Sequence, residues 1–292
     1  MRLGIVGRRG PISALLAGCL IVTLAHPAPA GAAPVRYVAL GDSYTAGPGI
    51  PHQTAESGGC RRSDHNYPHL VAAALGVARL IDVSCGSATT AHMTSPQALP
   101  GGLTNGPQFD ALTPDVDLVT LGIGGNDIGF GEIIVTCVRL SLLLPLGAPC
   151  RHHYNRHGDE LGERIDATAP KVAAVLAGIR ERAPAARIVV VGYPVILPAA
   201  GPGCWPVMPV AVGDVAWLRG MEGRLNAMLA EEAAAAGATF VDTYASSVGH
   251  DVCRLPGRKW IEGLVPTAPA SPVHPNARGM ANTARQVLAA LS

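Results

Sequence analysis

The sequence contains very little lysine and few charged or aromatic side chains. Only two of its 22 cationic residues are lysines, Lys171 and Lys259, and the others are arginines. Charged residues make up 15% of the 292 residues, and aromatic residues make up 4%. Cations and anions nearly balance, at 22 against 21. This composition excludes a polybasic protein that binds nucleic acid and a highly charged, disordered chain.

Several motifs that would indicate other kinds of chemistry are absent. Neither lysine follows a glycine, so the sequence has no phosphate-binding G-x-x-x-x-G-K loop, and it has no H-E-x-x-H zinc motif. The segment Gly122-Ile-Gly-Gly-Asn-Asp127 begins like a dinucleotide-binding fingerprint, but Asp127 stands where the third glycine is required. The G-x-S-x-G motif of the α/β-hydrolases is missing as well. We therefore expect neither a metal nor a cofactor.

The amino-terminal residues have the layout of a secretory signal peptide. Three arginines precede an apolar run over residues 12–25, and the small residues Ala28-Pro-Ala30 follow it. The apolar run holds 14 residues, whereas a helix needs roughly 20 to cross a bilayer. We predict that cleavage after Ala30 removes residues 1–30 and releases residues 31–292 as a secreted, extracellular chain without a transmembrane span.

The cysteine count fits an exported protein once this segment is removed. Cleavage takes away Cys19 and leaves six cysteines, at positions 60, 85, 137, 150, 204 and 253. An even number in an exported chain indicates disulfides, but the spacing alone leaves fifteen pairings open. In an alternative interpretation, Leu16-Ala-Gly-Cys19 is a lipobox, and lipidated Cys19 would anchor the protein to a membrane.

The mature chain alternates short apolar runs with longer helical patterns. Strands are predicted at residues 35–40, 78–83, 116–121, 188–191 and 239–241. Helices are predicted at residues 67–75, 165–182, 215–236 and 276–291. Buried strands that alternate with helices indicate an α/β fold whose parallel sheet is covered on both faces. No linker divides the chain, so we expect residues 31–292 to form a single domain.

Three polar motifs are placed where such a sheet would bring them together. Gly41-Asp-Ser43 follows the first strand, Gly124-Gly-Asn-Asp127 follows the third, and Pro272-Val-His-Pro-Asn276 precedes the last helix. In parallel sheets the working residues lie in loops at the carboxyl ends of strands. A serine, an asparagine and a histidine would there supply a nucleophile, an oxyanion donor and a base. Asp42 is interpreted as a hydrogen-bonding residue that orders its loop.

In this order the motifs resemble those of the SGNH, or GDSL, hydrolase superfamily. The resemblance rests on Gly41-Asp-Ser-Tyr44, on Gly122-Ile-Gly-Gly-Asn-Asp127 and on His274-Pro-Asn276, and it covers essentially the whole mature chain. Asp82-Val-Ser-Cys85 is similar to a motif of the secreted actinobacterial esterases and lipases with three disulfides. The resemblance implies a flavodoxin-like three-layer α/β/α sandwich with a parallel sheet of about five strands. It also implies the disulfides Cys60–Cys85, Cys137–Cys150 and Cys204–Cys253.

The resemblance further implies a role for each site residue. Ser43 is the expected nucleophile and His274 the expected base. The oxyanion would be stabilised by the Ser43 N–H, by the side-chain amide of Asn126, and by a backbone N–H from the block after the second strand. The family's glycine in that block aligns best with Ser87, and Gly86 precedes it, so both remain candidates.

One position departs from the pattern of many family members, which have an aspartate three residues before the histidine. Ser271 stands there in this chain, and a serine side chain supplies no negative charge. The actinobacterial subgroup uses a main-chain carbonyl at this point. We therefore expect the Ser271 carbonyl to accept the Nδ1–H of His274, which gives a Ser–His dyad.

These residues predict a secreted serine esterase or lipase that cleaves carboxylic esters, either acyl lipids or short-chain esters, through an acyl-enzyme intermediate. We expect it to act as a monomer, with an ester or acyl lipid as its partner. Two alternatives are a polysaccharide O-deacetylase and a secreted binding protein that kept the fold without the chemistry. Residues 140–146 are rich in leucine, and they are interpreted either as the lining of an acyl site or as a packed loop core.

Overall fold

The computed structural model describes residues 1, 3, 4, 35–55 and 58–292. Apart from three residues at its start, the predicted signal peptide lies outside the described residues, and so does Cys19. Among the helices of the described ranges, none is both long enough and apolar enough to cross a bilayer.

Five parallel strands form the central sheet. They are β1 (Arg36–Gly41), β2 (Arg79–Asp82), β5 (Leu118–Gly122), β6 (Arg187–Val191) and β7 (Thr239–Val241). Their spatial order is β2-β1-β5-β6-β7, and all four neighbouring pairs are parallel. Numbered by their sequence within this sheet, the strands follow the order 2-1-3-4-5 of flavodoxin-like folds. All five strands were predicted, with ends that differ by no more than about two residues, so the predicted fold class is confirmed.

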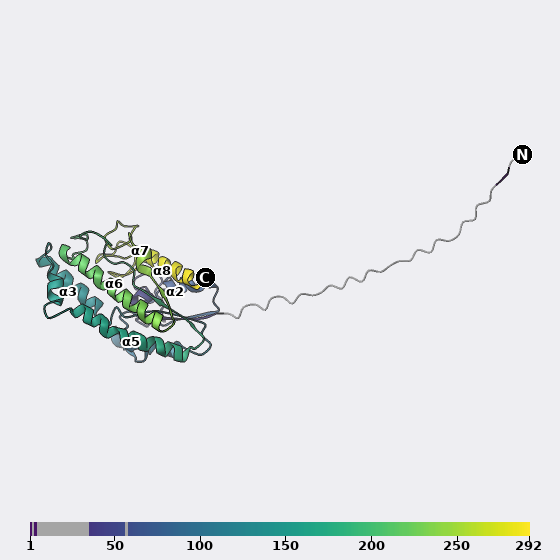
Figure 1. Ribbon diagram of the computed structural model, residues 1–292, viewed down its shortest axis with the longest axis horizontal. Coiled ribbons are helices and arrows are strands. Elements are labelled where there is room, and N and C mark those ends of the chain that lie inside the picture. The colour runs from purple at the N-terminus through teal and green to yellow at the C-terminus, as the bar shows by residue number, and fades with distance from the viewer. Residues whose placement is uncertain (2, 5–34, 56–57) are drawn as a thin grey trace. The chain divides into compact units, whose positions relative to one another are not determined.

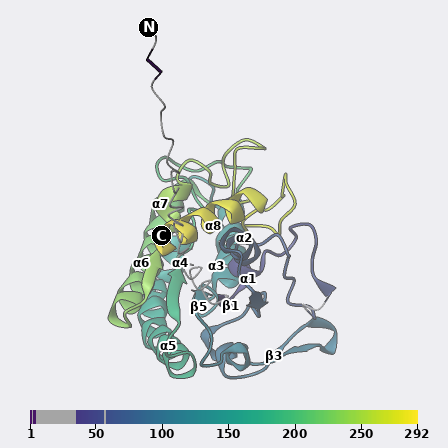
Figure 2. The ribbon, with the colours of Figure 1, turned by 90° about the vertical axis from the view of Figure 1, so that its right-hand side faces the viewer.

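Two layers of helices cover the sheet. Helices α2 (Tyr67–Leu75) and α8 (Ala277–Leu291) pack together on one face, and α5 (Glu160–Arg182) and α6 (Val212–Ala235) run side by side on the other (Figures 1 and 2). Successive side chains of a strand point to opposite faces. Leu40 of β1 therefore joins the core beneath α5 and α6, whereas Ala39 joins the core beneath α2 and α8.

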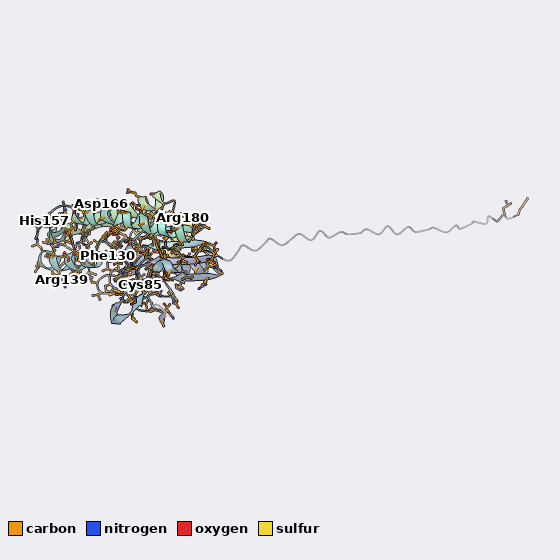
Figure 3. All side chains as sticks on the ribbon, turned by 90° about the horizontal axis from the view of Figure 1, so that it is seen from below. Cys85, Phe130, Arg139, His157, Asp166 and Arg180 are labelled. Atoms are coloured by element: carbon orange, nitrogen blue, oxygen red, sulfur yellow. A yellow bond between two sulfur atoms is a disulfide. The ribbon has the colours of Figure 1, made fainter. Side chains whose placement is uncertain are left out.

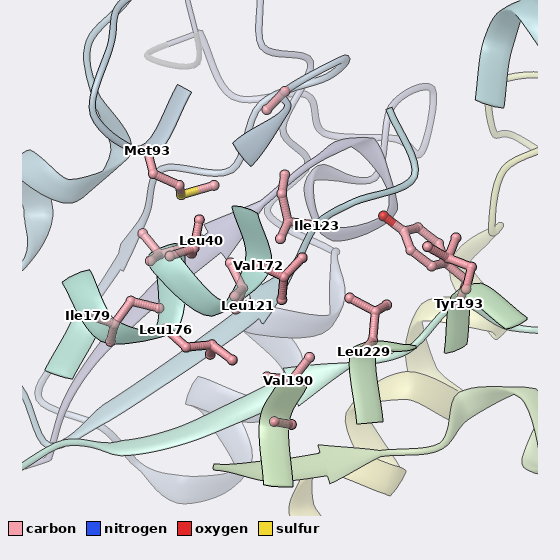
Figure 4. Packing of buried hydrophobic residues seen from close by; sticks show 14 of the residues in the cluster. Leu40, Met93, Leu121, Ile123, Val172, Leu176, Ile179, Val190, Tyr193 and Leu229 are labelled. Carbon is pink, nitrogen blue, oxygen red and sulfur yellow. The ribbon is translucent and has the colours of Figure 1, made fainter. Parts of the chain in front are cut away.

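The core beneath α5 and α6 is built from the helical stripe that the sequence shows. Val172, Leu176 and Ile179 of α5 lie against Leu121 of β5 and Leu229 of α6 (Figure 4). All of these side chains are almost completely buried. Burial of an aliphatic side chain contributes about 1.5–3 kcal/mol, so this stripe holds the two helices to the sheet.

The sequence did not predict the helices of the α3–α4 region. Helix α3 covers Phe130–Leu143 and α4 covers Pro149–Tyr154. Apolar residues surround α3 instead of forming one stripe: Ile133 is buried, whereas Val135 is exposed. Neither interpretation of residues 140–146 fits the structure, because Leu142, Leu143, Leu144 and Leu146 are exposed. The remaining elements are α1 (Ser43–Ala46), α7 (Thr243–Ser247), the 3₁₀ turns Thr90–Met93, Pro100–Gly102 and Gln108–Ala111, and the small antiparallel pair β3 (Gln97–Ala98) and β4 (Thr104–Asn105).

Three disulfides cross-link the described part of the chain. They are Cys60–Cys85, Cys137–Cys150 and Cys204–Cys253, the pairs that the resemblance implied. Cys85 follows β2, and its N–H donates to the carbonyl of Gly41 at the end of β1. The second disulfide ties α3 to α4.

Candidate active site

Ser43 is placed at the carboxyl end of β1 by a tight turn. Asp42 caps the short helix α1 by accepting the N–H of Tyr44 at 2.8 Å, and Ser43 is the first residue of that helix. Gly41 has a φ of 153°, and a Cβ there would lie 2.6 Å from the carbonyl oxygen of Gly122 on the neighbouring strand. Only glycine allows the chain to leave the strand at this point without a clash.

His274 faces Ser43 across the end of the sheet. The distance from His274 Nε2 to Ser43 Oγ is 2.7 Å, although 231 residues separate them in the sequence. A hydrogen bond of this length lets a histidine take the hydroxyl proton. The two side chains therefore have the geometry of a nucleophile and its base.

The carbonyl that orients His274 differs from the predicted one. His274 Nδ1 lies 2.8 Å from the carbonyl oxygen of Pro272, whereas the Ser271 carbonyl accepts the backbone N–H of His274 at 3.2 Å. Val273 has a φ of 59°, a value that a β-branched residue rarely adopts. This left-handed turn directs the Pro272 carbonyl toward the imidazole. The Ser271 hydroxyl is buried and has no hydrogen-bond partner among the described residues.

Tyr44 holds the histidine loop against the nucleophile's helix. Its hydroxyl donates to the carbonyl of Val273 at 2.6 Å, and its ring lies 5.0 Å from the imidazole of His274, centroid to centroid. The loop is fixed a second time by the N–H of Ser271, which donates to the carbonyl of Pro48 at 2.8 Å. This role of Tyr44 was not predicted, because a tyrosine beside a serine carries no signal of a contact with a loop so distant in sequence.

The electrostatic surroundings favour a neutral imidazole. Burial lowers the pKa of His274, the Pro272 carbonyl opposes that shift, and the positive charge of Arg61 adds to it. The result is a pKa below the ordinary value of about 6.5. The side chain is thus free to accept a proton at neutral pH.

Three hydrogen-bond donors are available for an oxyanion. The backbone N–H groups of Ser43 and Ser87 have no acceptor within the described residues. Asn126 gives one amide hydrogen to the carbonyl of Ala88 at 2.8 Å, which leaves the second hydrogen of that amide free. Asn126 and Ser43 line the same cavity.

The choice between Gly86 and Ser87 follows from the backbone. The N–H of Gly86 donates to the carbonyl of Cys60 at 3.0 Å, so it is not available to a substrate. Ser87 has a φ of 64°, in the left-handed region that favours glycine. This conformation explains why a glycine is expected here, and it shows that a serine can occupy the position. Of the two, the structure leaves Ser87 as the free donor.

Asp42 and Tyr193 form a buried support beneath these groups. Tyr193 donates its hydroxyl to Asp42 Oδ2 at 2.5 Å and accepts the N–H of Gly125 at 2.8 Å. Burial raises the pKa of Asp42 to about 7, although hydrogen bonds from Tyr193 and Tyr44 act against the shift. Asp42 does order its loop, as expected. Tyr193 was missed, and its only sequence signal is its place directly after β6 in Gly192-Tyr-Pro194.

An apolar cavity of about 80 Å³ opens beside Ser43. Its walls come from α3, α5, α6 and the segment that follows β6. Apart from Glu222 and the groups already described, the side chains that line it are aliphatic or aromatic, among them Phe130, Ile165 and Leu225. A site of this kind has the character to hold a hydrocarbon chain next to Ser43.

Within the described residues, one group of side chains has the spacing of metal ligands. His52, Asp64 and His65 bring their ligand atoms within 4.8 Å of one another. All three are exposed, and none lines the cavity beside Ser43.

Comparison with known proteins agrees with the fold and shows the family of the chain. The sequence model described as the GDSL-like lipase/acylhydrolase family matches residues 39–281. Lipase 2 of Streptomyces coelicolor is 46% identical over 260 residues, which cover 87% of this chain and 85% of that protein.

Two solved structures are similar throughout the folded region. Phospholipase A1 of Streptomyces albidoflavus superposes with a TM-score of 0.72 at 30% identity, over 88% of this chain and 99% of that one. The extracellular lipase of Streptomyces rimosus gives the same TM-score of 0.72 at 29% identity, again over 88% and 99% of the two chains.

Proposed function

Because the chain belongs to the GDSL-like lipase/acylhydrolase family and is thus a carboxylic ester hydrolase, we propose that it cleaves acyl esters with Ser43 as nucleophile and His274 as base. The observation that carries this assignment is the 2.7 Å distance between His274 Nε2 and Ser43 Oγ. A serine hydroxyl is a weak nucleophile at neutral pH and needs such a base within hydrogen-bond reach.

The reaction proceeds in two halves. Ser43 Oγ bonds to the ester carbonyl carbon while His274 Nε2 takes the hydroxyl proton. The tetrahedral oxyanion that results accepts hydrogen bonds from the N–H groups of Ser43 and Ser87 and from the amide of Asn126. Collapse of this tetrahedral intermediate breaks the bond to the alcohol oxygen. The alcohol departs with the proton from His274, and the acyl group remains on Ser43. Water repeats the same steps and releases the carboxylic acid.

His274 works here without a carboxylate partner. The Pro272 carbonyl accepts the Nδ1–H, which fixes the tautomer that presents a lone pair at Nε2. A neutral carbonyl stabilises the imidazolium less than a carboxylate would. The pair therefore acts as a Ser–His dyad, and its orienting group is the carbonyl of Pro272 and not that of Ser271.

The cavity beside Ser43 favours a hydrocarbon acyl group over a bare acetyl group. Its aliphatic walls extend along α3, α5 and α6, and each buried methylene contributes about 0.8 kcal/mol. This is the observation that favours an esterase or lipase over the O-deacetylase alternative. An acetyl group would leave these walls without contacts.

We infer that residues 1–30 are removed on export and that residues 31–292 act as one extracellular domain. Two observations support this inference. The six cysteines of residues 31–292 form three disulfides, which persist in oxidising compartments. The related lipase of S. rimosus is described as extracellular.

Labelling of the mature protein with a fluorophosphonate tests the assignment. We expect one covalent adduct by intact mass, no adduct with Ser43→Ala, and an unchanged adduct with the exposed control Ser95→Ala. Ser43→Ala is also expected to lower kcat by more than about a thousandfold. An unlabelled folded protein would contradict a serine hydrolase and favour the binding-protein alternative.

A series of p-nitrophenyl esters of rising chain length tests the acyl preference. We expect kcat/KM to rise from acetyl toward longer chains as the cavity fills. A maximum at acetyl would favour the deacetylase instead.

A further inference from the structure

Four leucines stand out into solvent where α3 ends. Leu142, Leu143, Leu144 and Leu146 are exposed by 61%, 81%, 56% and 85%. We call this group the leucine knob. Single exposed apolar side chains are ordinary, but a contiguous group of large ones marks a surface that meets another apolar phase or partner.

The knob is held by the fold around it. The N–H of Val212, at the start of α6, donates to the carbonyl of Pro145 at 2.9 Å. The disulfide Cys137–Cys150 closes the turn from α3 to α4. Hydrogen bonds and a covalent link thus fix the backbone that presents the leucines, so their exposure is not the fraying of a helix end.

Cations without carboxylate partners flank the knob. Arg139 on α3, Arg151 on α4 and Arg156 beyond it are exposed, and none forms an ion pair within the described ranges. Figure 3 places Arg139 at the same end of the folded region as His157. Three histidines of the same stretch, His152, His153 and His157, are exposed as well.

The acidic residues nearest in sequence are already engaged. Glu132 and Glu160 pair with Arg164, and Asp159 pairs with Arg224. Residues 133–158 contain Arg139, Arg151 and Arg156 and no acidic residue. The buried carboxylate of Asp214, which accepts the backbone N–H groups of Cys150 and Arg151, offsets one of these charges. The flank of the knob therefore keeps a surplus of positive charge, which attracts an anionic surface within about one Debye length.

Helix α3 connects this surface to the acyl cavity. Phe130, Ile133 and Ile134 at its first turns line the cavity beside Ser43, and Leu143 ends the helix. At 1.5 Å per residue, the end of α3 lies only about 14 Å from Ile134 along the helix axis. A lipid surface touched by the knob is thus within the length of one acyl chain of the cavity wall.

We propose that the leucine knob and its flanking arginines form a docking surface for an anionic lipid surface. The leucines insert among the acyl chains while Arg139, Arg151 and Arg156 contact the anionic head groups. This inference deepens the proposed function, since it names aggregated anionic lipid as the form in which substrate reaches the Ser43 site. The charge of the flank selects this partner over a second copy of the chain, whose knob would carry the same positive surroundings.

Co-sedimentation with vesicles tests the proposal on the inactive full mature chain Ser43→Ala, so that turnover cannot disturb the binding. We expect this protein to bind vesicles of phosphatidylglycerol and phosphatidylcholine more tightly than vesicles of phosphatidylcholine alone. The double variant Leu143→Ser/Leu146→Ser should weaken binding at least about tenfold, since it removes two inserted side chains. A matched control, Leu255→Ser/Val265→Ser, removes exposed apolar side chains elsewhere (73% and 79% exposed) and should bind as the parent does.

The charge contribution is tested separately. Arg151→Gln/Arg156→Gln should weaken binding to anionic vesicles by about tenfold or more and reduce its salt dependence, with no effect on binding to neutral vesicles. In the active background, all of these variants should hydrolyse a soluble short-chain ester at the parent rate, which shows that they fold.

Three results would overturn the proposal. One is the absence of binding to anionic vesicles, and another is equal weakening by the knob and control variants. The third is a concentration-dependent dimer that Leu143→Ser/Leu146→Ser abolishes, which would assign the knob to a second copy of the chain. Because binding is measured without Ser43, none of these results depends on whether the assignment of the nucleophile is right.

Discussion

At the scale of single residues, the environment of His274 determines when the site is active. Its imidazole is half-buried between Tyr44 and the loop, and no carboxylate of the described residues forms a hydrogen bond with it. Burial first, and the charge of Arg61 second, lower its pKa against the opposing effect of the Pro272 carbonyl. A base must be unprotonated to work, so activity should be lost as the pH falls through this lowered pKa.

Arg61→Gln is expected to move the acidic limb of kcat/KM toward higher pH. Removing the positive charge takes away one of the causes that lower the pKa of His274, so the imidazole binds its proton more readily. The measurement is the pH profile of kcat/KM on a soluble ester. Arg79→Gln serves as the matched control. Arg79 begins β2, at the end of the strand away from the site, and its substitution should leave the pH of the acidic limb unchanged. If the acidic limb of kcat/KM does not move, or moves toward lower pH, Arg61 has no such electrostatic role.

Tyr44→Phe is expected to lower kcat by about three- to tenfold and to leave KM nearly unchanged. The substitution keeps the ring in the cavity wall and removes one hydrogen bond, from the hydroxyl to the Val273 carbonyl, worth about 0.5–1.5 kcal/mol. The loop that carries His274 is then less firmly placed against Ser43. Steady-state kinetics on a soluble ester measure the effect, with Tyr244→Phe as control. A change confined to KM would instead mean that the hydroxyl contacts substrate.

The side chains of the site could be predicted from the sequence, but the backbone groups around them could not. Ser43, Asn126 and His274 are recognisable because their side chains must be of these types, and their catalytic roles stay predictions. The carbonyl that orients His274 was misassigned, because it depends on the positive φ of Val273. Valine is among the residues that disfavour this conformation, so no sequence rule would have placed it there.

At the scale of elements, the strands were easier to predict than the helices of the cavity wall. Short apolar runs that alternate with helical patterns predicted all five strands of the sheet. Helix α3 was missed because its apolar residues meet two different environments, the cavity on one side and solvent on another. A stripe of period 3.6 appears only when a helix has a single apolar face. Helix α3 links the cavity to the surface.

Helix α6 carries a carboxyl group into the cavity wall, and this leads to a prediction about stability. Glu222 lies beside Met221 and Leu225, and its carboxyl accepts the N–H of Ile196 at 3.1 Å. Burial raises the pKa of Glu222 well above its ordinary range. The unfolded chain releases this proton near pH 4.3, whereas the folded chain keeps it. Each pH unit between the two pKa values therefore costs up to about 1.4 kcal/mol of folding free energy.

Glu222→Gln should thus stabilise the protein at neutral and alkaline pH and make little difference near pH 4. The glutamine keeps an acceptor for Ile196 and has no proton to lose. Urea unfolding of the variant and the parent between pH 4 and pH 8 measures the difference, which should widen as the pH rises. Glu231→Gln, exposed on the same helix, is the control. Parallel stability curves for Glu222→Gln and the parent would show that the carboxyl ionises normally.

At the scale of the whole molecule, one sheet and three disulfides hold the described part together. The disulfides close segments with sequence separations of 25, 13 and 49 residues. On the chain-entropy account, loops of these lengths contribute about 3 to 4 kcal/mol each. Their sum approaches the entire net stability of a typical domain.

Reduction is therefore expected to lower the melting temperature sharply. The test compares thermal unfolding in dithiothreitol with unfolding in oxidised dithiothreitol, after mass spectrometry has counted six free thiols in the reduced sample. Since both halves of Cys60–Cys85 and Cys137–Cys150 are fully buried, reduction requires prior exposure to denaturant. The same midpoint in both samples would show that packing alone sets the stability.

The arrangement of the site also fixes when, during synthesis, the protein can first act. Ser43 follows the first strand and His274 precedes the last helix, so a ribosome makes the proposed nucleophile early and the proposed base almost at the end. A nascent or truncated chain can build most of its sheet and still lack the group that activates Ser43. On the proposed mechanism, hydrolysis consequently requires a chain that has been made at least as far as His274.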